Sequence, residues 1–136
     1  MATGLVTIAP TAAVLDAVPG AMDLLTDAER QRAVRLRQHA DRLGFMAAHV
    51  LVRLCAAHLF GLTLATPLAQ RCLTCGDAHG PAHLLGRPQA GISFSHGSGV
   101  VAAAVAPTPV GVDVELLASA RGLADLSHDI ASPAEA

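Results

Sequence analysis

Apolar side chains recur along this chain with two different periods. Over Ala40–Phe60 they return every three or four residues, which predicts a long helix with one apolar face that ends at Gly61. The members of this face are Leu43, Met46, Ala47, Val50, Leu51 and Leu54. Thr26 and Glu29 have the spacing of a capping box, which predicts an earlier helix that continues to about Arg37.

Shorter apolar runs predict strands. They lie at Leu5–Ala9, Gly91–Ser95, Val100–Ala106 and Val110–Leu116. The connections His96–Gly99 and Pro107–Pro109 are short, so the last three strands are expected to form an antiparallel meander. Pro10–Gly20 is predicted as loop with room for a turn of helix, and Thr66–Gln89 as a long loop punctuated by Pro and Gly. The pattern predicts an α+β fold, with helices packed on a small antiparallel sheet.

Composition narrows the class of protein. The 136 residues are enough for one domain or part of one, and the formal net charge of −2 gives no sign of nucleic-acid binding. The N-terminus lacks the pattern of a signal peptide, and the run Val100–Ala106 is far shorter than a membrane span. Three cysteines without a secretion signal favour the reducing cytoplasm, with Cys55 as a small buried apolar residue. We therefore expect no nucleic-acid partner and no membrane partner.

Two acidic residues follow a histidine-containing turn. Asp113 and Glu115 are two apart in a predicted strand, so both carboxylates are expected on one face, where they suit Mg²⁺. Ser95 and His96 precede a Gly-rich turn, where a hydroxyl, an imidazole and backbone N–H groups suit a phosphate. The structural alternatives are an exposed acidic pair and an ordinary hairpin turn.

Two further groups of side chains, one of Cys and His and one of Arg, are of types that bind metals or phosphates. The first is Cys72, Cys75, His79 and His83, which have the donor types of a small zinc site but also fit a cysteine-containing loop without metal. The second is an arginine-rich helical stretch formed by Arg30, Arg32, Arg35, Arg37, Arg42 and Arg53. Guanidinium groups bind phosphate well, but the stretch also fits a solvated helix face paired with Asp27, Glu29 and Asp41.

Three blocks occur in a characteristic order. They are Leu25–Arg42 with Arg53, the loop Arg71–Gly80, and Ile92–His96 followed by Val110–Glu115. Together they resemble the Sfp-type (surfactin-synthetase-activating) 4'-phosphopantetheinyl transferases. The third block is the most specific, and the resemblance extends from about Leu25 to Glu135.

The resemblance implies a function. The family transfers the 4'-phosphopantetheine group of coenzyme A to a serine of an acyl or peptidyl carrier protein, which makes it a holo-carrier-protein synthase. It implies that Asp113 and Glu115 bind magnesium, that Ser95 and His96 contact the phosphates of coenzyme A, and that Arg32 meets the nucleotide end. Asp113, Glu115 and His96 are thereby the candidate catalytic residues.

The chain also departs from the family pattern. It has no lysine and no later Trp-x-x-Lys-Glu motif. In the loop that contains Cys72, Cys75 and His79, Pro81 stands where the family usually has a basic residue, and Arg87 is a candidate substitute for that residue. Because the family fold consists of two similar halves, we expect residues 1–136 to be the N-terminal half, with open sheet edges that favour self-association. The alternatives are a non-catalytic remnant that binds coenzyme A or a carrier protein, and a small zinc-binding module.

Overall fold

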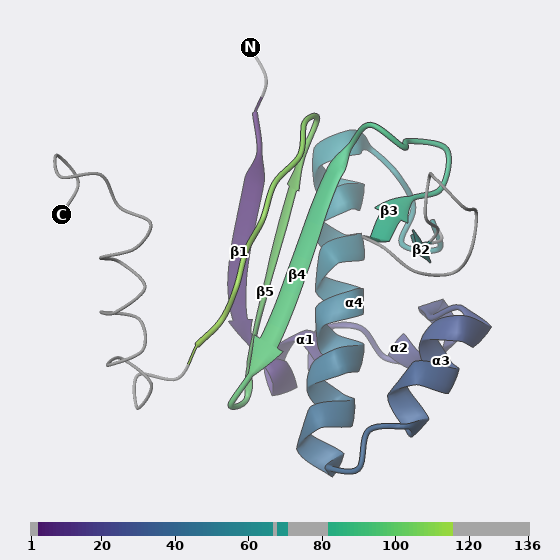
Figure 1. Cartoon of the computed structure of the whole chain (residues 1–136), viewed down its shortest axis with the longest axis vertical. Helices are drawn as coiled ribbons and strands as arrows, with labels where there is room; N and C mark the ends of the chain where they lie inside the picture. The colour runs from purple at the N-terminus through teal and green to yellow at the C-terminus, as the bar shows by residue number, and fades with distance from the viewer. Residues whose placement is uncertain (1–2, 67, 71–81, 116–136) are drawn as a thin grey trace, which may run out of the picture.

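One long helix, α4 (His39–Phe60), lies along one face of a three-stranded antiparallel sheet in the computed structural model (Figure 1). The structure describes residues 3–66, 68–70 and 82–115. The strands are β1 (Leu5–Pro10), β4 (Gly91–Gly97) and β5 (Val100–Ala106), in the order β1-β5-β4. The α+β class and these three strands confirm the predictions.

The strand β5 is the centre of the sheet and is fully paired on both sides. It is antiparallel to β1, with Leu5 opposite Val105, and to β4, with Phe94 opposite Ala103. Val101, Ala103 and Val105 belong to the core that α4 covers, and the alternate alanines of β5 are buried on the other face. Burial on both faces explains why this strand is a continuous apolar run rather than an alternating one.

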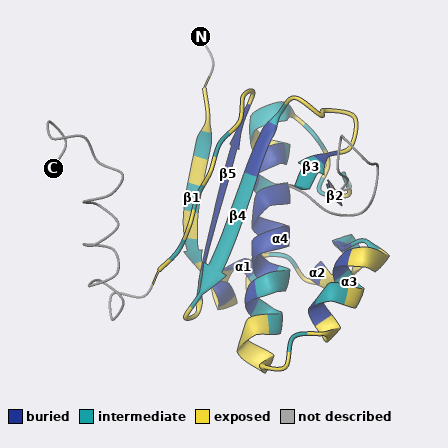
Figure 2. Cartoon of the chain, viewed as in Figure 1, coloured by how far each residue is buried: buried dark blue, intermediate teal, exposed yellow. Residues whose placement is uncertain are grey.

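Small side chains let α4 approach the sheet closely. Its buried surface includes Ala47, Ala48 and Ala56 together with Val50 and Val52, each at most 1% exposed. Figure 2 shows buried positions along β5 and much of α4, whereas the first turn of α4 is exposed. Gly61 ends the helix with a φ of 69°, as predicted, because a left-handed C-terminal residue favours glycine.

Several short elements complete the described chain. They are α1 (Thr11–Ala17), α2 (Ala21–Leu24), α3 (Asp27–Val34), β2 (Leu68–Gln70) and β3 (Ala82–Leu84). The segment predicted as mostly loop after Pro10 therefore holds a helix of seven residues, because burial of Thr11 and Val14 stabilises it. The capping box of α3 is present as predicted, but α3 ends at Val34 rather than near Arg37. The predicted long loop contains the β2–β3 hairpin.

The predicted third meander strand is wrong for residues 110–115. This segment is irregular and lies along β4, where the backbone N–H of Val112 donates to Ser93 Oγ at 3.0 Å. A methyl group at Gly91 would lie 2.1 Å from the carbonyl oxygen of Thr108 and 2.8 Å from the backbone nitrogen of Val110, so the chain that leads into this segment packs directly on the start of β4. The position beside β5 that a meander requires is occupied by β1. Leu116 lies outside the described residues.

The helix α4 is long and apolar enough to cross a membrane, judged by length and composition alone. Core helices of soluble proteins pass the same test, and 56% of the apolar window of α4 is buried within the protein. Its packing on β4 and β5 is sufficient reason for its apolar composition.

The outer edge of β1 leads to a prediction about self-association. Val6 and Ile8 are 61% and 68% exposed on this edge strand, and Thr3–Pro10 contains no charged side chain. Two copies can therefore pair edge to edge around a two-fold axis without charge repulsion. We expect Val6→Lys with Ile8→Lys to abolish concentration-dependent association in sedimentation velocity, with little change in the melting temperature.

The matched control is Leu85→Lys, which changes an exposed apolar residue away from this sheet. It should leave the association unchanged. A wild-type chain that sediments as a monomer at all concentrations would contradict the prediction.

Candidate functional site

The end of β4 positions the candidate site residues, and it divides them between two sides. Successive residues of a strand point to opposite faces. Phe94 packs with the core beneath α4, whereas Ser93 bonds to the segment that crosses the other face. Ser95 therefore shares a side with Ser93, and His96 shares a side with Phe94.

Ser95 and Asp113 meet on the face away from α4. The Ser95 hydroxyl donates to Asp113 Oδ1 at 3.0 Å, and the backbone N–H of Val114 donates to Ser95 Oγ at 3.2 Å. Asp113 and Glu115 are exposed, whereas Val112 and Val114, which flank Asp113, are half-buried. The two carboxylates thus share the solvent side although the segment is not a strand.

His96 lies on the opposite side of β4, against α4. A methyl group at Gly44 would be 2.7 Å from His96 Nδ1 and 3.1 Å from its Cγ, so the imidazole rests directly on the helix. The resemblance implies Asp113, Glu115 and His96 as candidate catalytic residues, and the structure places His96 on the other side of β4 from Asp113. The cause is the two-residue period of the strand, which separates His96 from Ser95 and from its partner Asp113.

Arg32 borders the same part of α4 as His96. Its guanidinium carbon lies 5.9 Å from the ring centre of Phe45, the residue that follows Gly44. Phe45 stacks on His49 at 4.0 Å, and His49 meets the edge of Phe94 at 4.4 Å. The structure therefore brings Arg32 and His96 to adjacent residues of α4, and it places Ser95 and Asp113 together on the other side.

A buried ion pair joins α3 to α4 beneath this region. Arg53 donates from Nη2 to Glu29 Oε1 at 2.5 Å and from Nη1 to Glu29 Oε2 at 2.9 Å, and both side chains are at most 1% exposed. Glu29 Oε1 also accepts from the backbone N–H of Thr26, which completes the capping box. His49 Nε2 lies 3.8 Å from Glu29 Oε2, and its Nδ1 lies 2.8 Å from the carbonyl oxygen of Phe45.

The two titratable groups beside Arg53 have shifted pKa values. Burial raises the pKa of Glu29, but hydrogen bonds from Arg53 and Thr26 and the Arg53 charge outweigh it, so the net shift is downward. Burial lowers the pKa of His49 to about 4, against the opposing effects of the Phe45 carbonyl and the Glu29 charge. Near neutral pH the cluster therefore contains an ionised Glu29, a charged Arg53 and a neutral His49.

Sequence reasoning missed this cluster as a unit. The capping box predicts the position of Glu29, but the sequence offers a solvated helix face as one alternative for Glu29 and does not predict its pairing with Arg53. One available signal was that His49 and Arg53, four residues apart, lie beside the apolar face of a predicted helix, where an unpaired charge is costly.

Arg30 and Arg42 of the stretch bond to other groups of the protein. Arg30 pairs with Asp27 and donates to the Leu25 carbonyl at 2.7 Å. Arg42 Nη1 donates to the carbonyls of Leu36 at 2.6 Å and Arg37 at 3.0 Å, which closes the turn between α3 and α4. Arg30, Arg42 and Arg53 thus have partners within the protein, and the exposed Arg30–Asp27 pair fits the alternative of a solvated helix face.

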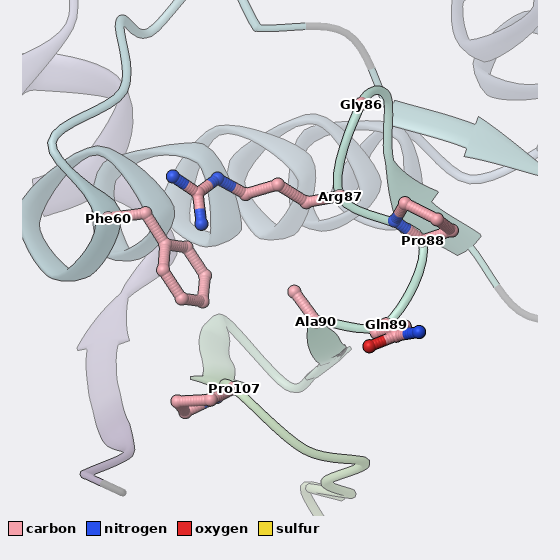
Figure 3. Close-up of a pocket in the computed structure, with 7 residues that line it drawn as sticks. All are labelled: Phe60, Gly86, Arg87, Pro88, Gln89, Ala90 and Pro107. Carbon is pink, nitrogen blue, oxygen red and sulfur yellow. The ribbon is translucent and has the colours of Figure 1, made fainter.

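Arg87 lines a pocket at the other end of the sheet (Figure 3). Its guanidinium lies 4.9 Å from the ring centre of Phe60, and the pocket of about 380 Å³ is also bordered by the Gly86–Ala90 loop and Pro107. Phe60 is the last residue of α4, whereas Gly44 lies in its second turn, about 24 Å away at the rise of an α-helix. Arg87 is therefore remote from His96 and Asp113.

The described residues contain no cluster of three or more His, Cys, Asp or Glu side chains that could hold a metal ion. Cys72, Cys75 and His79 of the predicted zinc set lie outside the described residues, and His83 is half-buried in β3. Cys55 is buried as predicted and donates to Thr7 Oγ1 at 3.5 Å, and burial raises the pKa of its thiol.

Comparison with known proteins gives no family assignment. No protein-family model matches the chain, and no curated protein matches it.

The buried ion pair yields a prediction about stability. Glu29→Gln leaves Arg53 charged and buried, so we expect the free energy of unfolding in urea to fall by about 3–5 kcal/mol. The control Asp27→Asn breaks an exposed pair with Arg30 and should cost less than about 1 kcal/mol. Equal losses in the two variants would contradict the structural role of Glu29.

The depressed pKa of His49 yields a prediction about pH. Between about pH 4 and pH 6.5 the folded chain holds His49 neutral and the unfolded chain protonates it. Unfolding then takes up a proton, so stability falls with decreasing pH by up to about 1.4 kcal/mol per pH unit. Glu29 adds a further loss at lower pH, below its unfolded value of 4.5.

The measurement is urea unfolding at several pH values between 4 and 7. We expect His49→Gln to reduce the slope in this window, and the control His58→Gln, which removes an exposed histidine of α4, to retain it. An unchanged slope in His49→Gln would refute the assignment to His49.

Proposed function

We propose that this chain is a 4'-phosphopantetheinyl transferase domain that binds coenzyme A with Mg²⁺. Its reaction is the transfer of the phosphopantetheine group to a serine of an acyl or peptidyl carrier protein in the cytoplasm. The serine oxygen forms a bond to the phosphorus, the P–O bond to 3',5'-ADP breaks so that 3',5'-ADP leaves, and the proton of the serine hydroxyl passes to solvent. The resemblance of the sequence motifs to this family is the origin of the proposal.

The observation that supports the proposal best is the hydrogen bond between Ser95 and Asp113. It connects the two halves of the most specific motif, and both carboxylates of that motif are on the solvent side. Magnesium is commonly held by one or two carboxylates together with water and substrate phosphates, so Asp113 and Glu115 suffice as its protein ligands. When bound, Mg²⁺ polarises the diphosphate of coenzyme A and neutralises charge that develops there.

The remaining residues of the proposed site bind and orient. Ser95 holds Asp113 through its hydroxyl, and His96 and Arg32 bind phosphates on the α4 side. Because β4 is an edge strand, a ligand as long as coenzyme A has access to both sides around its open edge. The two sides of β4 would thereby hold different phosphate groups of one ligand.

A non-catalytic domain that binds coenzyme A without turnover is the second candidate. The observation that favours it is the absence of lysine from the sequence, which removes the lysine that the family uses in its chemistry. Both candidates bind coenzyme A at the same site, but only the transferase passes the phosphopantetheine group to a carrier protein.

Magnesium-dependent binding of coenzyme A tests both candidates. We expect calorimetric titration to show binding with Mg²⁺ and at least a tenfold weaker binding with a chelator or in Asp113→Ala. The control Asp16→Ala, an exposed acid on α1, should bind as the wild type does. Equal binding by folded Asp113→Ala and wild type, independent of Mg²⁺, would sink the proposed site.

Intact-mass analysis of an apo carrier protein then separates the two. A phosphopantetheine mass gain with coenzyme A and Mg²⁺, reduced roughly a hundredfold or more in rate by Asp113→Ala, supports the transferase. Binding without a mass gain supports the non-catalytic domain.

A further inference from the structure

Gly44 is the one glycine inside α4, and it is buried where the helix meets β4. Glycine weakens a helix interior because its backbone loses more freedom on folding than that of any other residue. Its φ does not require glycine, since the left-handed glycines of the described residues are Gly20, Gly61, Gly86 and Gly99. The reason for glycine at this position is therefore one of space.

The space is filled by the side chain of His96. A methyl group at Gly44 would lie 2.7 Å from Nδ1, 3.1 Å from Cγ and 3.2 Å from Cβ of His96. Rotation of the imidazole alone relieves the first two approaches and leaves the Cβ contact. Any side chain at position 44 thus moves His96 or pushes α4 away from β4.

We propose that Gly44 is a positioning residue for His96: the absence of a side chain at position 44 lets the imidazole lie against α4, in the place from which it binds a phosphate of the ligand. The geometry that supports this is the fit of His96 into the space beside Gly44, where Nδ1, Cγ and Cβ all lie within 3.2 Å of the methyl position. The ligand assignment rests on the proposed function, whereas the packing of His96 on Gly44 does not.

The test is a double-mutant cycle with Gly44→Ala, His96→Ala and the double variant. Alone, Gly44→Ala should lower the melting temperature and shift the imidazole NMR signals of His96. In the His96→Ala background the same change should lower the melting temperature by clearly less, because the two approaches to the imidazole are gone and only the 3.2 Å approach to Cβ opposes the helix preference of alanine. The matched control Gly111→Ala, which has no atom within 4 Å of its added methyl group, should leave the His96 signals in place.

Binding of coenzyme A with Mg²⁺ is measured on the same variants. Gly44→Ala and His96→Ala should each weaken binding about tenfold, and the double variant should be no weaker than either. Unshifted His96 signals with additive effects on melting would overturn the positioning role. Wild-type protein that binds no coenzyme A would refute the proposed function and the phosphate assignment, while the melting cycle still decides whether Gly44 positions His96.

Discussion

The close packing of α4 on the three-stranded sheet governs the arrangement of the rest of the described chain. Alanines and valines on the helix meet valines and an alanine on β5, so the two layers approach more closely than larger side chains would permit. In an interior packed this closely, the addition or removal of even one methyl group affects the neighbouring side chains. Gly44 is the extreme case, since its missing side chain is the space in which His96 lies.

The buried ion pair of Glu29 and Arg53 places α3 on this helix. Removal of two charges from water is costly, and the cost is offset here by two short hydrogen bonds between them and a backbone donor from Thr26. Burial in the same cluster lowers the pKa of His49, because the neutral imidazole is more stable than the charged one away from water. Arg32 is also on α3 and lies against Phe45, the first member of the aromatic row Phe45–His49–Phe94, so the ion pair that fixes α3 also fixes the backbone that bears Arg32.

The period of β4 then decides how the candidate site is divided. Ser95 and Asp113 lie on one side of the strand and His96 and Arg32 on the other, so any single ligand that touches all four must pass the open edge of β4. An extended ligand with several phosphates has that shape, and a compact one does not. The pocket beside Arg87 and Phe60 stands apart from both groups at the far end of α4.

Local sequence determined the elements whose signals are local. The capping box at Thr26, the apolar period and glycine stop of α4, and the β-branched runs of β1 and β5 each depend on neighbours in the chain. Only the tertiary structure decided which strand lies beside β5, because β1 competes successfully for the edge that residues 110–115 would otherwise take. It also decided that Glu29 pairs with Arg53, 24 residues away, and that His96 faces α4 rather than Asp113. The strand order, the ion pair and the direction of His96 depend on the desolvation of charges and on which surfaces meet. The apolar period of a single segment predicts neither of these.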